Sequence, residues 1–201
     1  MHDHWLITTA RRASYLVIAF ALIALVAFTT LAGDKTMSEL AQTDTYFLPA
    51  ISALLSILAL AVVLVGAWFW QRERFGTLGN VAFVVALLGT LLSAGAQWSY
   101  VFVVPYFADA APKLVNTGQG VLLAGFIISY AVLALGWILF GLATMRAGLV
   151  PRWLGVLMVA GAAIAFLPLP SRTLVLGLAV ALLGHRMGRT RAVESREPAL
   201  A

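Results

Sequence analysis

The side chains best suited to binding a ligand gather around Pro105, where a long apolar run ends. They combine amides, a carboxylate and aromatic rings: Gln97, Trp98, Tyr100, Tyr106, Asp109, Asn116 and Gln119. Such a mixture can line a shallow pocket that opens to water or to lipid. The alternative is an interfacial aromatic belt with polar loop caps, since Trp and Tyr concentrate where hydrocarbon meets water. The pattern leaves both interpretations open, and it predicts that the Gln97 amide faces another helix.

The sequence contains no recognisable set of catalytic residues. His2 and His4 supply two metal donors, too few for a site of fixed geometry, and His185 beside Arg186 fits a helix end better than a haem ligand. The serines within apolar runs have no histidine or carboxylate nearby in those runs to activate them. No glycine-rich phosphate loop is present. We therefore expect a protein that is not an enzyme, with no catalytic residues, no metal and no cofactor.

Composition indicates the environment in which these side chains are placed. Of 201 residues, 62% are apolar and only 10% are charged, against roughly 25% charged in a soluble domain. Apolar runs reach the roughly 20 residues that cross a bilayer, and none alternates as a β-barrel strand would. The net charge of +5 comes from residues at the ends of apolar runs, so no nucleic-acid partner is expected. The absence of cysteine leaves the redox compartment open.

The sequence therefore predicts an all-α, polytopic transmembrane helix bundle formed by residues 1–187. Its six spans are expected at residues 13–32, 47–70, 80–104, 121–145, 153–167 and 173–187. The last two are short for a hydrocarbon core of about 30 Å, so they either span with help from flanking residues or form a re-entrant hairpin. Residues 188–201 are polar and predicted to be a disordered cytoplasmic tail.

Basic residues orient the predicted bundle. Cytoplasmic loops are enriched in Lys and Arg. With six spans and both termini in the cytoplasm, the inner segments hold ten arginines, namely Arg11, Arg12, Arg72, Arg74, Arg146, Arg152, Arg186, Arg189, Arg191 and Arg196. The outer loops hold only Lys35, Lys113 and Arg172. This arrangement is the one that the sequence favours.

Small residues predict which helix faces meet, because helices in lipid pack where backbones can approach closely. One face of the last helix carries Gly177, Ala181, Gly184 and Gly188. Gly89 and Ser93 share a face of the third span, and Gly125 and Ser129 share a face of the fourth. All three faces are expected to point inward.

Residues 141–155 read Gly-Leu-Ala-Thr-Met-Arg-Ala-Gly-Leu-Val-Pro-Arg-Trp-Leu-Gly. Gly148 can take the left-handed conformation that ends a helix, and Pro151 suits the start of the next. This turn, with the Val-Val-Pro-Tyr stretch at Pro105, resembles a family of uncharacterised bacterial multi-pass membrane proteins, a domain of unknown function. The resemblance covers about a quarter of the chain. It implies a bacterial plasma membrane, with actinobacteria as one source, and it brings no activity.

Three functions are compatible with these observations. The first is a non-enzymatic membrane protein that serves as an accessory or interaction subunit, or binds a lipidic ligand between helices. Its expected partners are membrane lipid and either another membrane helix or a second copy of the chain. The second is an uncoupled transporter or channel for a small neutral or apolar solute, because the spans carry no ionisable group for ion coupling. The third, a membrane-embedded enzyme, would require Asp44, Asp109 and His185 to converge.

Overall fold

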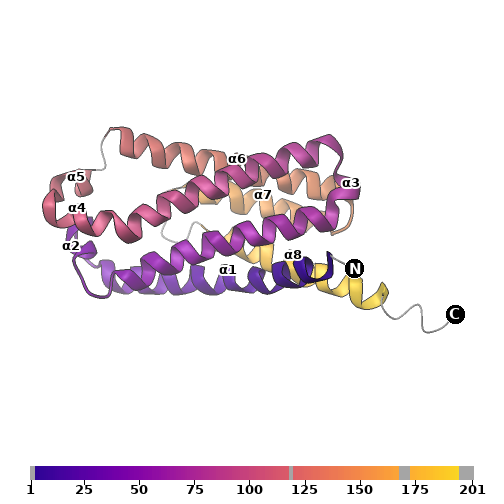
Figure 1. Cartoon of the computed structure of the whole chain (residues 1–201), viewed down its shortest axis with the longest axis horizontal. Helices are drawn as coiled ribbons and strands as arrows, with labels where there is room; N and C mark the ends of the chain where they lie inside the picture. Colours follow the sequence, from indigo (N-terminus) through magenta and orange to yellow (C-terminus); the bar gives the residue numbers. More distant parts are fainter. Residues whose placement is uncertain (1–2, 118–119, 168–172, 195–201) are drawn as a thin grey trace.

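The computed structural model describes residues 3–117, 120–167 and 173–194, and every regular element in these ranges is an α-helix. This confirms the all-α prediction. The helices are α1 (Asp3–Ala32), α2 (Met37–Ala41), α3 (Phe47–Phe102), α4 (Val104–Ala110), α5 (Pro112–Thr117), α6 (Val121–Ala147), α7 (Arg152–Phe166) and α8 (Leu174–Glu194). Figure 1 shows the long helices lying lengthwise beside one another, with α2, α4 and α5 at one end.

Helix α3 consists of two antiparallel arms, 47–75 and 77–102, because the chain reverses at Gly76 (Figure 1). Gly76 has φ +58° and ψ −161°, a backbone conformation that only glycine adopts readily. Across the reversal, Trp68 stacks on Phe83 with ring centroids 4.8 Å apart, and its Nε1 donates to Asn80 Oδ1 at 3.0 Å. The second span was predicted to end at residue 70, but residues 71–75 continue the first arm.

The six long segments form a closed ring. Helix α1 packs against the first arm of α3, where Ala10 meets Gly66, and the second arm packs against α6, where Gly89 meets Leu133. Helix α6 packs against α7, α7 against α8, and α8 against α1. As a result, the start of α1 and the end of α8 lie at the same end of the molecule (Figure 1).

Apolar side chains fill the centre of the ring. Trp137 and Phe140 are fully buried on α6, and Phe140 packs edge-on against Phe75 with centroids 5.3 Å apart. The Trp137 indole Nε1 donates to Thr90 Oγ1 at 3.1 Å, which satisfies the only polar atom of that side chain. Among residues 5–117, 123–167 and 173–188, whose side-chain burial the structure describes, no charged side chain is buried.

Most of the predicted small-residue faces do point inward. A Cβ added at Gly89 would lie 2.5 Å from Leu133 Cα, and one added at Gly136 would lie 2.7 Å from the Val85 carbonyl carbon. On α8, Gly177, Gly184 and Gly188 contact α1. The prediction for Gly125 was wrong, because this residue is exposed and a Cβ there would meet nothing within 4 Å. Its predicted companion Ser129 is buried.

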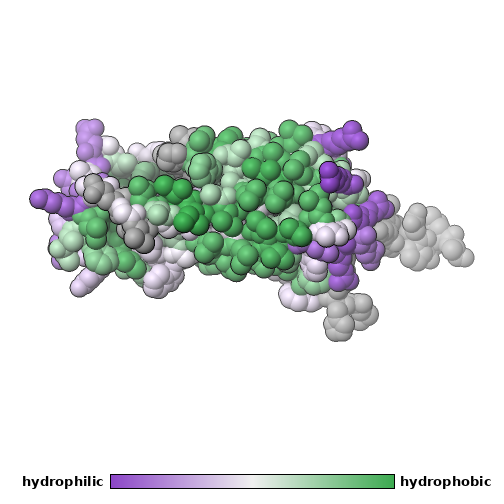
Figure 2. All heavy atoms as spheres, turned by 90° about the horizontal axis from the view of Figure 1, so that it is seen from above, coloured by the Kyte–Doolittle hydropathy of each residue, from purple (hydrophilic) through white to green (hydrophobic). Residues whose placement is uncertain are grey.

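Within the described residues, three helices are long and apolar enough to cross a membrane: Trp5–Ala32, Phe47–Phe102 and Leu123–Ala147. Helix α7 and residues Leu174–Gly188 are apolar but shorter. In Figure 2, apolar side chains cover the middle of the visible face and polar ones gather toward its two ends. This distribution matches a helical bundle whose sides meet hydrocarbon and whose ends meet water.

Helix boundaries differ from the predicted spans at both ends of the chain. Helix α1 begins at Asp3, ten residues before the predicted start at residue 13, and Ile7 and Ala10 of this extension are buried. Helix α8 continues to Glu194, although a disordered tail was predicted from residue 188. The rest of that tail, residues 195–201, and the Pro168–Arg172 connection lie outside the described residues.

Candidate ligand-binding cavity

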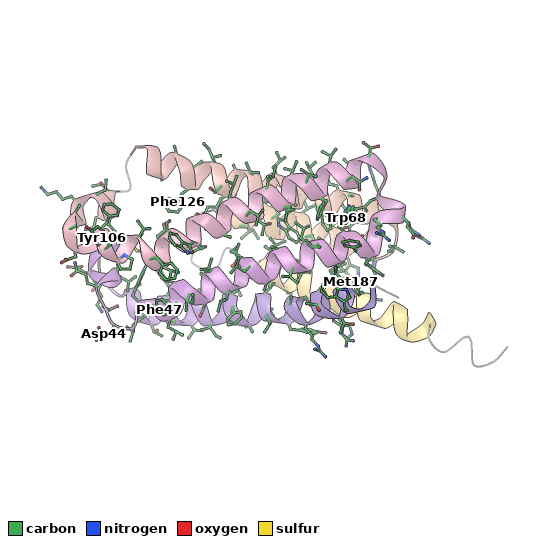
Figure 3. All side chains as sticks on the ribbon, in the orientation of Figure 1. Asp44, Phe47, Trp68, Tyr106, Phe126 and Met187 are labelled. Carbon is green, nitrogen blue, oxygen red and sulfur yellow. The ribbon has the colours of Figure 1, made fainter. Side chains whose placement is uncertain are left out.

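An apolar cavity of about 720 Å³ lies at the end of the molecule where α2, α4 and α5 gather. Its walls come from the last turn of the second α3 arm, the first half of α6, the end of α7 and the three short helices. The lining residues are Met37, Ser99, Tyr100, Val103, Val104, Phe107, Leu114, Val115, Leu123, Phe126, Ile127, Tyr130 and Phe166. Figure 3 labels Phe126 on α6 and Tyr106 on α4 at this end.

Pro105 marks the junction between α3 and the short helices that contribute lining residues to the cavity. Pro105 lacks an amide hydrogen and is tolerated only near a helix start, so α3 ends at Phe102 and Pro105 lies at the beginning of α4. Pro112 likewise begins α5. No helix was predicted between the spans at 80–104 and 121–145, whereas this interval contains most of α4 and all of α5. Together with α2, these short helices form what we call the cap.

Side-chain hydrogen bonds hold the cap together. The Asn116 amide accepts a hydrogen bond from the Ser38 backbone N–H and donates one to Ser38 Oγ, each at 2.9 Å. Gln42 Nε2 donates to the Ala108 carbonyl at 2.8 Å. These bonds tie α2 to α5 and to α4, respectively. The cap is thus fixed over the cavity by contacts between segments far apart in the sequence.

The cap also contains a pH-sensitive helix start. Thr36 and Glu39 form a capping box at α2, in which Glu39 Oε2 accepts from the Thr36 backbone N–H at 2.7 Å. This bond, followed by the bond from the Thr36 hydroxyl, lowers the pKa of Glu39 below its ordinary value. A lowered pKa means that the stabilisation is present above the ordinary value of 4.5 and is lost as pH falls through the lower folded value.

We therefore expect acidification below pH 4.5 to increase amide hydrogen exchange in α2 relative to α6, beyond the intrinsic pH dependence. Glu39→Gln should abolish most of this pH dependence, because the amide does not titrate in this range. The measurement is hydrogen–deuterium exchange on both forms across that range. An equal response in the two forms would contradict the assignment to Glu39.

Gln97 bonds inside the bundle, which confirms the prediction that it faces another helix. Its Nε2 donates to the Tyr130 hydroxyl at 2.8 Å. Tyr130 is buried and lines the cavity, so this pair places polar atoms at an otherwise apolar wall. One turn further along α3, the Tyr100 ring packs 5.0 Å from the Phe126 ring, and both line the same cavity.

The structure separates the other residues of the predicted pocket. Trp98 and Tyr106 are 52% and 70% exposed and do not line the cavity, and Asp109 is also exposed. Asn116 belongs to the cap bonds, and Gln119 lies outside the described residues. Of the seven predicted residues, Tyr100 therefore lines the cavity and Gln97 bonds to another lining residue.

Sequence reasoning missed the wall formed by α6. Leu123, Phe126, Ile127 and Tyr130 all line the cavity and follow the i, i+3, i+4, i+7 spacing of one helix face. A tyrosine on that face within an apolar helix was a usable signal. From the sequence we chose polar residues as pocket candidates, whereas most of the residues that line the cavity are apolar.

The cavity can hold an apolar molecule and offer it a few hydroxyl contacts. Among the described residues that line it, none is charged. Within the described residues, no three His, Asp or Glu side chains are grouped so as to hold a metal ion. No protein-family model, curated protein or solved structure matches this chain.

Proposed function

We propose that the protein is a six-span integral membrane protein of a bacterial plasma membrane and binds a lipidic ligand in the cavity. It acts without catalysis, as a binding or accessory subunit. The observation that carries the proposal is an apolar cavity of about 720 Å³, a size typical of small-molecule sites, at the end of a strongly apolar bundle. The packed centre of the ring, occupied by Trp137 and Phe140, favours binding over conduction through the bundle.

The threading is supported by where the basic residues fall on the six segments. Arg72 and Arg74 directly precede the reversal at Gly76, and Arg146 and Arg152 flank the turn between α6 and α7. Lys35 and Lys113 belong to the opposite end, next to α2 and in α5. By the positive-inside rule, the reversal and the α6–α7 turn face the cytoplasm, and the cap faces outward.

The threading predicts one-sided labelling of single cysteines, which the cysteine-free sequence makes simple to read. Lys113→Cys in the cap should react with a membrane-impermeant maleimide in intact cells, or in spheroplasts if an outer membrane is present. Arg74→Cys should react only after the membrane is opened. Labelling of Arg74→Cys from outside, with Lys113→Cys protected, would reverse the proposed orientation.

Lipid binding predicts a difference between two neighbouring isoleucines of α6. Ile127 lines the cavity at 50% exposure, whereas Ile128 is 58% exposed and does not line it. Ile127→Trp should occupy cavity volume and reduce co-purifying lipid about tenfold or more, a loss that corresponds to about 1.4 kcal/mol. Ile128→Trp is the matched control and should retain wild-type lipid.

The measurement is native mass spectrometry of the full chain released from detergent, with bound lipid counted by mass. Equal lipid occupancy in both variants, with both folded, would show that the cavity is not the binding site. Because the two positions are adjacent and similarly exposed, a general effect of tryptophan on the helix would reduce binding in both.

A further inference from the structure

We propose that the cavity selects uncharged amphiphiles with a hydroxyl headgroup and excludes chains ending in a carboxylate. This inference rests on the proposed function and names the class of ligand for the same site. A long-chain alcohol is the simplest member of that class, and a hydroxyl-bearing diacylglycerol is another.

The charge of the wall is the first reason. All thirteen lining residues that the structure describes are uncharged, and their side-chain polar atoms are the hydroxyls of Ser99, Tyr100 and Tyr130. An ionised carboxylate moved into such surroundings loses its water without gaining a cation. A hydroxyl is far less costly to desolvate and needs only one or two hydrogen-bond partners. The wall therefore discriminates against charge.

The hydrogen-bond direction at Ser99 is the second reason. Ser99 Oγ donates its proton to the Ala96 carbonyl at 2.7 Å within the α3 arm. Its oxygen lone pairs remain able to accept, so Ser99 offers the cavity an acceptor. An alcohol can donate to an acceptor, whereas a carboxylate only accepts and gains nothing there. Ser99 thus favours a ligand that carries an O–H group.

The remaining wall suits the hydrocarbon chain of such a ligand. Val103 between α3 and α4, Phe126 on α6 and Phe166 on α7 contribute apolar surface. Leu123 and Ile127, which are 47% and 50% exposed on α6, extend the lining to the lipid-facing side of the bundle. A chain can therefore continue from the cavity toward surrounding lipid.

Among the described residues, Lys35 and Lys113 both precede lining residues in the sequence, and Lys113 is the nearer of the two. Lys113 is exposed on α5, directly before the lining residue Leu114. An anionic headgroup that extended past the cap could reach its ammonium group. Lys113→Gln therefore belongs in the experiment as the variant that detects this alternative.

The experiment measures binding of radiolabelled cetyl alcohol and radiolabelled palmitate to the purified full chain by scintillation proximity, at a pH where palmitate is ionised. We expect saturable cetyl alcohol binding at least about tenfold tighter than palmitate binding.

Ser99→Ala should weaken alcohol binding about threefold to tenfold, the value of one hydrogen bond, with no effect on palmitate. Thr117→Val, which alters an exposed hydroxyl outside the cavity, is the control and should bind as wild type. Competition by unlabelled diacylglycerol distinguishes a glycerolipid from a free alcohol as the preferred source of the hydroxyl.

Palmitate binding equal to or tighter than alcohol binding would overturn the inference, as would alcohol binding unaffected by Ser99→Ala. Palmitate binding that is lost in Lys113→Gln would overturn it in favour of an anionic ligand. A different result would contradict the proposed lipid binding in the cavity itself: Ile127→Trp would leave the binding of every probe unchanged.

Discussion

Gly89→Leu is expected to remove most of the folded protein from detergent extracts. At Gly89 the second α3 arm approaches α6 so closely that an added Cβ would lie 2.5 Å from Leu133 Cα. The obstacle is backbone, which cannot rotate away as a side chain can. Overpacking commonly costs about 1–3 kcal/mol, and a backbone contact places this variant at or above about 3 kcal/mol. Gly136, on the same interface, has its own backbone contact with the α3 arm and cannot compensate.

Gly125→Leu provides the matched control, because the same substitution is made on the partner helix where a Cβ would meet nothing within 4 Å. It should retain wild-type yield and thermal stability. The two variants can be compared by fluorescence-detected size-exclusion chromatography after heating. Similar melting temperatures for both would mean that the α3–α6 contact is not as close as described.

Trp137→Ala is expected to destabilise the protein by about 3 kcal/mol, the lower end of the range for removing a large buried aromatic side chain. The indole is fully buried, packs against Phe140 with centroids 5.7 Å apart and donates a hydrogen bond to Thr90. Removing it leaves a cavity in the centre of the ring and takes away the donor that Thr90 accepts from. We expect the lower end of that range because, in the proposed membrane environment, the hydrophobic effect contributes little between helices and the loss is mainly one of packing.

Trp153→Ala makes the same change at a tryptophan that is 52% exposed at the start of α7. Its cost should stay below about 1 kcal/mol, as for most surface substitutions. Reversible unfolding by increasing mole fraction of sodium dodecyl sulfate measures both values. A loss for Trp153→Ala as large as that for Trp137→Ala would indicate that central packing does not dominate stability.

Local signals in the sequence predicted the long helices and some of their ends. Apolar runs and their length predicted an all-α bundle, and Gly148 ends α6 in the expected left-handed conformation, with φ +69° and ψ 10°. Pro151 directly precedes α7, as that turn also predicted. The internal hydrogen bond of the Gln97 amide could be predicted from the sequence alone, because a polar group within an apolar helix needs such a partner. The family resemblance of this turn stays a prediction.

The cap and the cavity could not be predicted in the same way. Helices α4 and α5 have seven and six residues, too few to show a periodic pattern, and hydrogen bonds such as Asn116 to Ser38 hold them across the fold. The cavity wall is shared by six helices, and most of its residues are ordinary apolar ones. Gly125 shows why small residues alone do not predict helix contacts: a small residue marks a possible contact face but does not identify the neighbouring helix.

The contact between α1 and α8 has a consequence for how the protein is made. Ser14 and Val17 of α1 meet Gly184 and Gly177 of α8, and the Tyr15 hydroxyl lies 3.3 Å from His185 Nδ1, although 170 positions separate the latter two residues. While a ribosome is still synthesising the chain, α1 therefore lacks its contact with α8 until almost all of the chain has been made. During that interval the side of α1 that later contacts α8 is accessible to chaperones and proteases, so slow translation before Leu174 should shorten the lifetime of the nascent protein.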